Sequence, residues 1–299
     1  VSFDRGVTFH FAAGRITSLG PGQFVLVVRN EQAFLSRYGS SLLGLIAGEY
    51  AGRLANEGEN VSLVDTWNGT IAQFEYGDGR GWPPAADGGG HSLVPLDSAL
   101  PGEPEGTLDW PGNWRASTYI AGSPGRDDPE LRTVVWINEF LANPGEPDPQ
   151  SDGTAGDWIE LYNPTAAAVD LTDWYLSDDV GDLKKWPIPA TPIPAYCCVT
   201  FEDVNTFGLS MDGEELLLSH LPGTAEGRVA DAVRFKAQEP NITLGRYPDG
   251  GDYWFRLTPS PGAANANPIS DIVIGELMYH PVDANEEYIE LYNPLSEDV

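Results

Sequence analysis

Residues 157–164 read Asp-Trp-Ile-Glu-Leu-Tyr-Asn-Pro (DWIELYNP), and residues 287–294 read EYIELYNP. Six of the eight positions are identical, and the other two exchange acid for acid and aromatic for aromatic. Because side chains alternate between the two faces of a strand, both segments predict a short β-strand, and in the first of them Ile159 and Leu161 face the core. The closing Asn-Pro ends the strand, since proline cannot donate a ladder hydrogen bond and asparagine favours turns.

The same two regions of the chain share further segments in the same order. These are INEFLANP (137–144) with IGELMYHP (274–281), and GSPGRDDP (122–129) with PSPGAANA (259–266). The two members of each pair are 137 residues apart. A looser likeness joins GPGQFVLVV (20–28) to IPAYCCVTF (193–201). Self-similarity at a fixed spacing indicates a repeat architecture, here with a unit of about 137 residues.

The order of these segments predicts the domain boundaries. We expect residues 1–130 to form a domain without the opening strands of the unit, residues 131–268 to form a complete domain, and residues 269–299 to hold the opening strands of a third repeat. A sandwich short of two strands exposes a sheet edge, which invites pairing. Three arrangements are open: completion by further repeats of a longer array, by residues 269–299 of a neighbouring copy, or by the same strands folding back within one chain.

Composition favours an all-β fold made of short strands. The 299 residues include 34 Gly and 25 Pro, and turn dipeptides recur between the apolar stretches. That rhythm is typical of a β-sandwich or barrel. We expect one short helix at NEQAFLSRYG (30–39), where Asn30 can cap the first turn and Gly39 can end the last.

The chain is strongly acidic. Its 16 Lys and Arg against 45 Asp and Glu give a formal net charge of −29. A field of that sign repels phosphate backbones and anionic lipid, so we expect no nucleic-acid partner. The sequence shows no apolar stretch of about 18 residues, and direct membrane insertion is therefore not expected.

Longer ordered motifs carry a family resemblance. The run VVWINEFLANP (134–144), followed by DWIELYNPTAAAVDLTDWYLSDD (157–179), resembles the opening of a bacterial lamin-tail domain, the immunoglobulin-like sandwich also found at the end of nuclear lamins. Residues 131–268 resemble the family through to its closing Ser-Pro-Gly, and residues 1–130 resemble its second part. The resemblance implies tandem immunoglobulin-like β-sandwiches in a large secreted or surface protein. One departure is Gly275, which stands where the complete unit has Asn138, so these two positions are not expected to share a polar role.

Signatures of catalysis do not emerge from the sequence. The four histidines stand at different positions of the repeat, and no nucleophile elbow, metal-binding histidine pair or phosphate loop occurs. We therefore expect no enzyme and no catalytic residue.

Two glutamates recur with the repeat: Glu139 and Glu160 return as Glu276 and Glu290. One interpretation is a paired site, or a shared hydrogen-bonding role across adjacent strands. The other is that these side chains face solvent or cap nearby backbone groups. The sequence alone leaves both open.

Acidic loops suggest one cofactor, calcium. Calcium binds six to eight oxygen ligands in flexible loops, and extracellular modules bind it weakly. The alternative is that these acids are solvated loop residues, because their spacing does not match an EF-hand. The candidate ligands are Asp148, Asp152, Asp157, Asp178, Asp179 and Asp182.

Aromatic residues on the recurring strand suggest an interface. Alternation projects Trp158 and Tyr162 from the face opposite Ile159, and Tyr288 and Tyr292 take the same positions in the next unit. Exposed aromatic patches mark interfaces more often than free surface. The alternative is that a neighbouring loop covers them.

These observations predict a non-enzymatic structural repeat of an extracellular or cell-surface protein. Its expected partners are copies of itself or adjacent repeats, joined through domain contacts or strand complementation into a fibre, stalk or layer. The alternative from another class is a module of a secreted enzyme that binds a carbohydrate or another ligand. An open aromatic platform with adjacent acids would favour that alternative.

Overall fold

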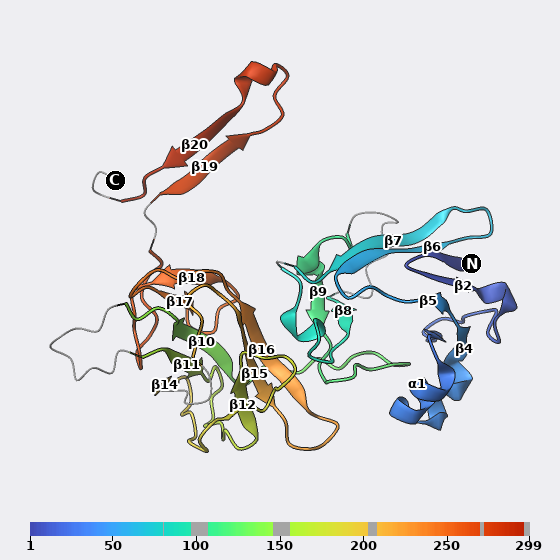
Figure 1. Cartoon of the computed structure of the whole chain (residues 1–299), viewed down its shortest axis with the longest axis horizontal. Coiled ribbons are helices and arrows are strands. Elements are labelled where there is room, and N and C mark those ends of the chain that lie inside the picture. The colour runs from blue at the N-terminus through green and yellow to red at the C-terminus, as the bar shows by residue number, and fades with distance from the viewer. Residues whose placement is uncertain (80, 97–106, 146–155, 203–207, 270–271, 296–299) are drawn as a thin grey trace. The chain divides into compact units, whose positions relative to one another are not determined.

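The computed structural model describes residues 1–79, 81–96, 107–145, 156–202, 208–269 and 272–295 (Figure 1). The chain is mostly β, with 35% of its residues in strands and 9% in helices. The strands form several small, mostly antiparallel sheets, which confirms the all-β class. Two compact units share the chain. Unit 1 is Val1–Val134, Asp170–Pro192 and Gly213–Phe235, and unit 2 is Val135–Val169, Ile193–Asp212 and Lys236–Val299.

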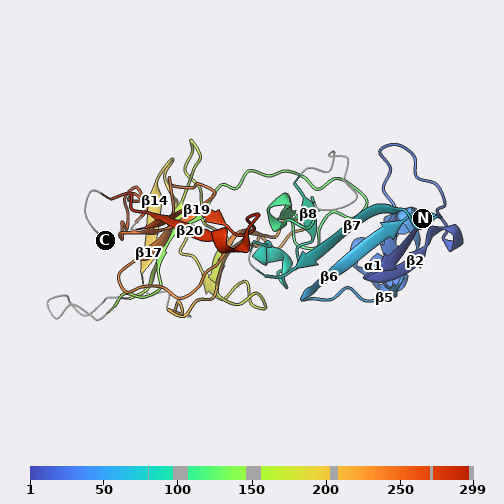
Figure 2. The same ribbon diagram turned by 90° about the horizontal axis from the view of Figure 1, so that it is seen from above.

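Unit 1 contains a five-stranded sheet of order β5-β2-β1-β6-β7. All of its neighbouring strands are antiparallel, and β6 and β7 form a long hairpin that Figure 2 shows from above. In β2 the buried Val7 and Phe9 alternate with exposed residues, as expected for a sheet with one covered face. The strands are β1 (Ser2–Arg5), β2 (Val7–His10), β5 (Ala51–Gly52), β6 (Gly58–Val64) and β7 (Thr70–Gly77).

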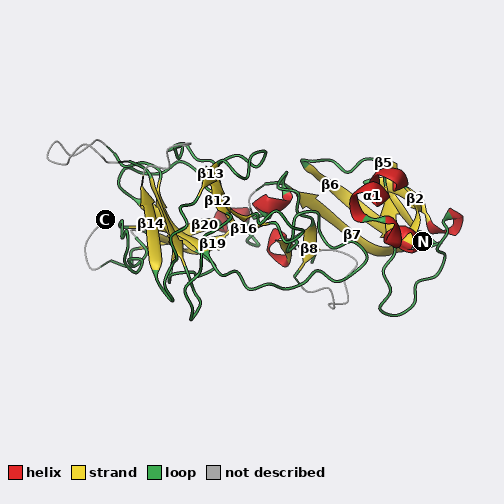
Figure 3. Cartoon of the chain, turned by 90° about the horizontal axis from the view of Figure 1, so that it is seen from below, coloured by secondary structure: helices red, strands yellow, loops and turns green. Residues whose placement is uncertain are grey.

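The helix expected at residues 30–39 is present in unit 1 as α1 (Glu31–Tyr38). The Asn30 side chain accepts a hydrogen bond from the Ala33 N–H at 2.7 Å, and the helix ends at Gly39, whose φ is 98°. Before and after α1 lie β3 (Leu26–Val28) and β4 (Ile46–Glu49), which pair in parallel. Short 3-10 turns are also visible (Figure 3): η1 (Phe11–Ala13), η2 (Ser40–Leu45), η3 (Pro84–Ala86), η4 (Pro111–Asn113) and η5 (Ala284–Glu286).

Two more sheets belong to unit 1. One is the antiparallel pair β8 (Leu93–Pro95) and β9 (Trp114–Ala116). The other has the order β13-β12-β15-β16, and β15 is apolar on both faces because Leu216, Leu217 and Leu218 are all fully buried. Leu217 packs with Ala85 and Val229 in a small apolar cluster. The strands are β12 (Trp174–Ser177), β13 (Trp186–Pro187), β15 (Glu215–His220) and β16 (Arg228–Arg234).

Unit 2 contains a five-stranded antiparallel sheet of order β14-β11-β10-β17-β18. Its apolar face carries Ile137, Phe140, Ile159 and Leu161, each no more than 1% exposed, which confirms the direction expected for Ile159 and Leu161. The recurring segment DWIELYNP is the interior strand β11. The strands are β10 (Trp136–Leu141), β11 (Trp158–Tyr162), β14 (Cys198–Glu202), β17 (Thr243–Arg246) and β18 (Trp254–Leu257).

A second hairpin of unit 2 consists of β19 (Val273–Met278) and β20 (Tyr288–Tyr292). It repeats the β10–β11 hairpin position by position. Glu276 lies opposite Glu290 as Glu139 lies opposite Glu160, and both hairpins shift register at the residue before the first glutamate. The two hairpins therefore share strand length, pairing and bulge.

Candidate functional site

The recurring acids of β10 and β11 meet in the structure. Glu139 and Glu160 are direct cross-strand partners, and both are fully buried. A β-bulge at Asn138 makes this pairing, because the extra residue brings Glu139 onto the face opposite Ile137 and Phe140. Simple alternation from Ile137 would have placed Glu139 on the core face instead.

Glu139 is held by hydroxyl and backbone donors from distant parts of the chain. Its Oε1 accepts from the Thr243 hydroxyl and from the Ser260 N–H at 3.2 Å, and its Oε2 accepts from the Ser260 hydroxyl at 2.8 Å. Burial raises the pKa of Glu139, while the hydrogen bonds from Thr243 and Ser260 act against that rise. The side chain therefore works as a buried acceptor for the segment that follows β18.

Glu160 is held in the same way. Its Oε1 accepts from the Asn138 amide at 3.0 Å. Its Oε2 accepts from the Thr200 hydroxyl at 3.1 Å and from the Gly262 N–H at 2.7 Å. Each buried oxygen of this carboxylate thus has at least one protein donor, as buried charge requires.

The Ser-Pro-Gly turn at 260–262 supplies donors to both acids. The Ser260 carbonyl accepts from the Ala263 N–H at 3.1 Å, and Gly262 has a φ of 73°, which fits the third position of a tight turn. This geometry directs the N–H groups of Ser260 and Gly262 to Glu139 and Glu160. We name these two glutamates with their Ser260–Gly262 turn the acid clamp. It unites the three sequence motifs that recur together.

Asn138 links the acid clamp by hydrogen bonds to the segment that follows β17. Its amide oxygen accepts from the Gly250 N–H at 3.0 Å, and its amide nitrogen also reaches Asp249 at 3.2 Å. Asp249 in turn accepts from the Asn265 N–H at 2.9 Å. Beside this network the Arg246 guanidinium lies 4.8 Å from the ring centre of Trp136 and 4.6 Å from that of Trp254. The outer face of the unit 2 sheet therefore carries a connected hydrogen-bond network around Glu139, Glu160 and Asn138.

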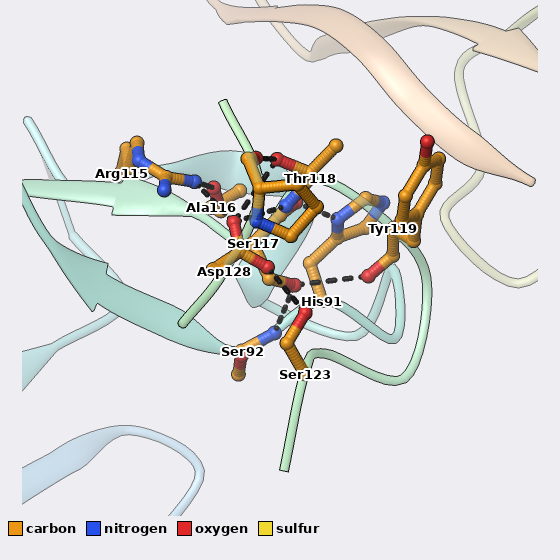
Figure 4. A network of polar contacts seen from close by, with 10 residues as sticks. His91, Ser92, Arg115, Ala116, Ser117, Thr118, Tyr119, Ser123 and Asp128 are labelled. Carbon is orange, nitrogen blue, oxygen red and sulfur yellow. Dashed lines mark hydrogen bonds and ion pairs between the residues drawn. The ribbon is translucent and has the colours of Figure 1, made fainter. Parts of the chain in front are cut away.

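A second polar network lies in unit 1 around His91 (Figure 4). The buried His91 donates from Nδ1 to the Ser117 carbonyl at 2.6 Å and accepts at Nε2 from the Val229 N–H at 3.0 Å. These partners require the neutral ring, and burial lowers the pKa of His91 accordingly. No sequence pattern pointed to this network, because none of the other histidines stands at a position equivalent to His91.

Asp128 is the second centre of that network. Its carboxylate accepts from Arg115 at 2.5 Å, from the Ser123 hydroxyl at 2.8 Å and from the Thr118 N–H at 2.9 Å (Figure 4). Burial opposes the charge on Asp128, but the hydrogen bonds from Arg115, Ser123 and Thr118 outweigh it and lower the pKa. Asp128 therefore anchors the segment that follows the Ser-Pro-Gly turn at 123–125.

The acids considered for calcium serve local structure where the structure describes them. Asp157 accepts from the Leu209 N–H at 2.7 Å, and Asp178 pairs with Lys185. Asp179 and Asp182 accept backbone N–H groups two residues ahead, from Gly181 and Lys184. Within the described part of the chain, no three His, Cys, Asp or Glu side chains gather closely enough to hold a metal ion. Asp148 and Asp152 lie outside the described residues, so calcium binding there stays a prediction.

The aromatic residues considered for an interface differ in exposure. Trp158 is only 7% exposed, and Tyr162 is half-buried, while most of the loop expected to cover them lies outside the described residues. The backbone at Gly250 lies against the Tyr162 ring. Tyr288 and Tyr292 of the β19–β20 hairpin are exposed. Their part in an interface stays a prediction.

Comparison of the chain with models of known protein families, with curated proteins and with solved structures found no match. The described helices include none that is long and apolar enough to span a membrane.

Proposed function

We propose that the chain is a non-enzymatic structural repeat of a large extracellular or cell-surface protein, built from lamin-tail-like immunoglobulin sandwiches and assembling into a fibre, stalk or layer. One observation carries the proposal. The β19–β20 hairpin reproduces the β10–β11 hairpin in strand length, register and bulge. Repetition of a structural element supports an array, because in repeat proteins each unit packs on its neighbours.

The acid clamp supports a structural role for the recurring acids. Glu139 and Glu160 are fully buried and accept hydrogen bonds from protein groups on both carboxylates. A general acid or base needs access to a substrate atom, which these enclosed side chains do not offer. The motifs that recur in the sequence are thus explained by the way the Ser260–Gly262 turn closes over the sheet.

The aromatic residues also weigh toward the structural role. A carbohydrate-binding module would present an open aromatic platform beside its acids. In unit 2 the indole of Trp158 is buried and its neighbouring Glu160 is enclosed by donors. The exposed Tyr288 and Tyr292 instead lie on the hairpin that also exposes apolar residues, which suits an interface with another protein surface.

Electron microscopy of the purified full chain tests this proposal, together with its mass in solution over a wide range of concentration. The expected result is strings or filaments with a repeat of domain size and a mass that grows with concentration. Separate particles of one chain at every concentration would contradict the proposal. A screen against polysaccharides covers the alternative function, since tight binding by separate particles would favour a ligand-binding module.

A further inference from the structure

The strand pair β8–β9 of unit 1 resembles the strand pair β17–β18 at the edge of the unit 2 sheet. In unit 2, β17 pairs with β18 so that Arg246 lies opposite Trp254. In unit 1, β8 pairs with β9 so that Pro95 lies opposite Trp114. Pro95 therefore corresponds to Arg246, and three residues earlier Ser92 corresponds to Thr243. The Thr243 hydroxyl binds Glu139 in the acid clamp. β8 and β9 are therefore the counterparts of β17 and β18.

The Ser-Pro-Gly turn of unit 1 also has the geometry of the turn in the acid clamp. The Ser123 carbonyl accepts from the Arg126 N–H at 3.3 Å, and the Ser260 carbonyl accepts from the Ala263 N–H at 3.1 Å. The glycines Gly125 and Gly262 have φ values of 79° and 73°. Unit 1 consequently carries the donor half of an acid clamp.

The two sheets differ in what lies between the corresponding strands. In unit 2 the β10–β11 hairpin joins β17 to β14. The sequence repeat aligns β14 with β3 of unit 1, since residues 193–201 resemble residues 20–28. Among the described residues, β8 pairs with β9 alone and β3 pairs with β4 alone. Each of β8 and β3 thus has one edge without a strand neighbour in the described part of the chain.

A groove lies beside β8 in unit 1. It has a volume of about 720 Å³ and is lined by Phe24 next to β3, by β8 itself and by the Ser123-Pro124 turn. Its charged lining residues are of both signs: Arg115, Arg126, Asp127, Asp128 and Glu130. Two of its walls, β8 and the Ser-Pro-Gly turn, are the counterparts of β17 and of the Ser260–Gly262 turn, which contact the β10–β11 hairpin in unit 2.

The β19–β20 hairpin carries the residues that correspond to the acceptor half of the acid clamp, the part that β10 and β11 supply in unit 2. Ile274, Leu277, Ile289 and Leu291 are 56–68% exposed, although their counterparts on β10 and β11 are buried. Glu276 and Glu290 stand at the positions of Glu139 and Glu160, and the hairpin adds acidic charge at Glu286 and Glu287. This surface therefore combines an apolar face with two acids in the clamp register.

We propose that the β19–β20 hairpin of one copy docks into the groove of a second copy, between β8 and β3, and completes an acid clamp there. β19 lies against β8 with Leu277 beside Leu93, and β20 lies against β3. Glu276 accepts from Ser92 and Ser123, and Glu290 accepts from the Gly125 N–H. This inference rests on the proposed function, because it names the contact through which the repeats assemble.

The docking changes one hydrogen bond in unit 1. The Ser123 hydroxyl, which donates to Asp128 in the free groove, turns to Glu276, while Asp128 keeps Arg115 and Thr118 as partners. Val94 stands at the position of Gly245, so Glu276 approaches β8 less closely than Glu139 approaches β17. Groove and hairpin are different surfaces of the same chain, and such a contact repeats head to tail without closing.

Two single-site variants each disrupt one side of this contact, the hairpin or the groove. Ile289→Asp places a charge on the apolar face of the hairpin, and Phe24→Asp places one in the groove. Both residues are exposed, so neither change disturbs a buried core. Ile71→Asp is the matched control, because Ile71 is an equally exposed apolar residue of unit 1 that does not line the groove.

The measurement is the mass distribution of each chain by analytical ultracentrifugation. We expect wild type and Ile71→Asp to elongate with concentration, and each groove or hairpin variant alone to stay a single chain. An equimolar mixture of the two variants should stop at a dimer, because only one intact hairpin and one intact groove remain. Glu290→Ala should lower the association constant by about tenfold, the effect of one lost charge-assisted hydrogen bond.

Three other outcomes would show that the hairpin of a second copy does not occupy the groove. Elongation that survives both variants would overturn this inference and leave the proposed function standing on a different contact. A single-chain wild type whose hairpin amides are protected from hydrogen exchange would show docking within one chain, and would also overturn it. A single-chain wild type with unprotected hairpin amides would overturn both the inference and the assembly proposed above.

Discussion

At the scale of single residues, the acid clamp shows what a buried carboxylate requires. Burial removes the water that stabilises the charge, so hydrogen-bond donors from the protein must replace it. Glu160 receives such donors from Asn138, Thr200 and Gly262, which belong to three separate segments of the chain. One side chain thereby holds the bulge, a neighbouring strand and the closing turn together.

Replacing Glu160 should therefore cost much more than replacing an exposed acid of the same sheet. We expect Glu160→Ala to lower the free energy of unfolding by about 3 kcal/mol, because it leaves three donors without their acceptor. Glu202→Ala on β14 is the control, since Glu202 is exposed and its loss should change stability by less than about 0.5 kcal/mol. Urea unfolding followed by tryptophan fluorescence measures both, and equal effects would contradict the structural role of Glu160.

His91 makes the stability of unit 1 depend on pH. Its neutral ring accepts the Val229 N–H, and burial lowers its pKa below the ordinary value of 6.5. In the unfolded chain the ring takes up its proton at higher pH than in the folded chain, so protonation favours unfolding. The contribution of His91 is complete above pH 6.5 and is lost as the pH falls through 6.5 toward the lower pKa of the folded chain.

The size of this effect is at most about 1.4 kcal/mol per pH unit below that point. Melting temperatures of wild type and His91→Asn, compared from neutral to mildly acidic pH, isolate it from the other titrating groups. We expect the two curves to converge as the pH falls, because the wild type alone loses the His91 contribution. Parallel curves for His91→Asn would show that this ring does not titrate with unfolding.

At the scale of secondary-structure elements, local patterns were readable and distant partners were not. The alternation in DWIELYNP predicts β11 and the direction of Ile159, and the capping residue predicts α1. The bulge at Asn138 breaks that alternation, so Glu139 could not be placed from its own neighbours. Its donor Ser260 lies 121 residues away in sequence. Only the joint recurrence of both glutamates with Ser-Pro-Gly could have indicated that these segments meet.

The bulge itself gives a prediction for β10. Asn138→Gly reproduces the residue that β19 carries at Gly275 and removes the amide that binds Glu160 and Gly250. We expect the free energy of unfolding to fall by about 2 kcal/mol, from the lost hydrogen bonds together with the flexibility of glycine in a strand. Asn56→Gly, in an exposed turn, is the matched control and should change stability little. A loss no larger than that of the control would mean that the bulge is held by backbone pairing alone.

At the scale of the whole molecule, charge decides how copies of the chain meet. Each copy carries a formal charge of −29, so approach of two copies is opposed over long distances whatever their contact surfaces are. Salt shortens that repulsion to a Debye length of about 10 Å at 0.1 M. The groove lining has charges of both signs, Arg115 and Arg126 with Asp127, Asp128 and Glu130, so the proposed contact gains little from opposite charge. Net repulsion, rather than local attraction, should therefore govern the salt dependence of assembly.

We accordingly expect the association constant to rise as sodium chloride is raised from low ionic strength to about 0.1 M. Calcium and magnesium chloride at equal concentration then separate general screening from specific binding. An equal rise of the association constant with both ions would indicate screening alone, because their charges are the same. Promotion by calcium only, reversed by a chelator together with a lower melting temperature, would indicate a site that includes the loop acids such as Asp148 and Asp152. Sedimentation velocity measures each case, and assembly that weakens steadily with added salt would show that opposite charges at the contact dominate instead.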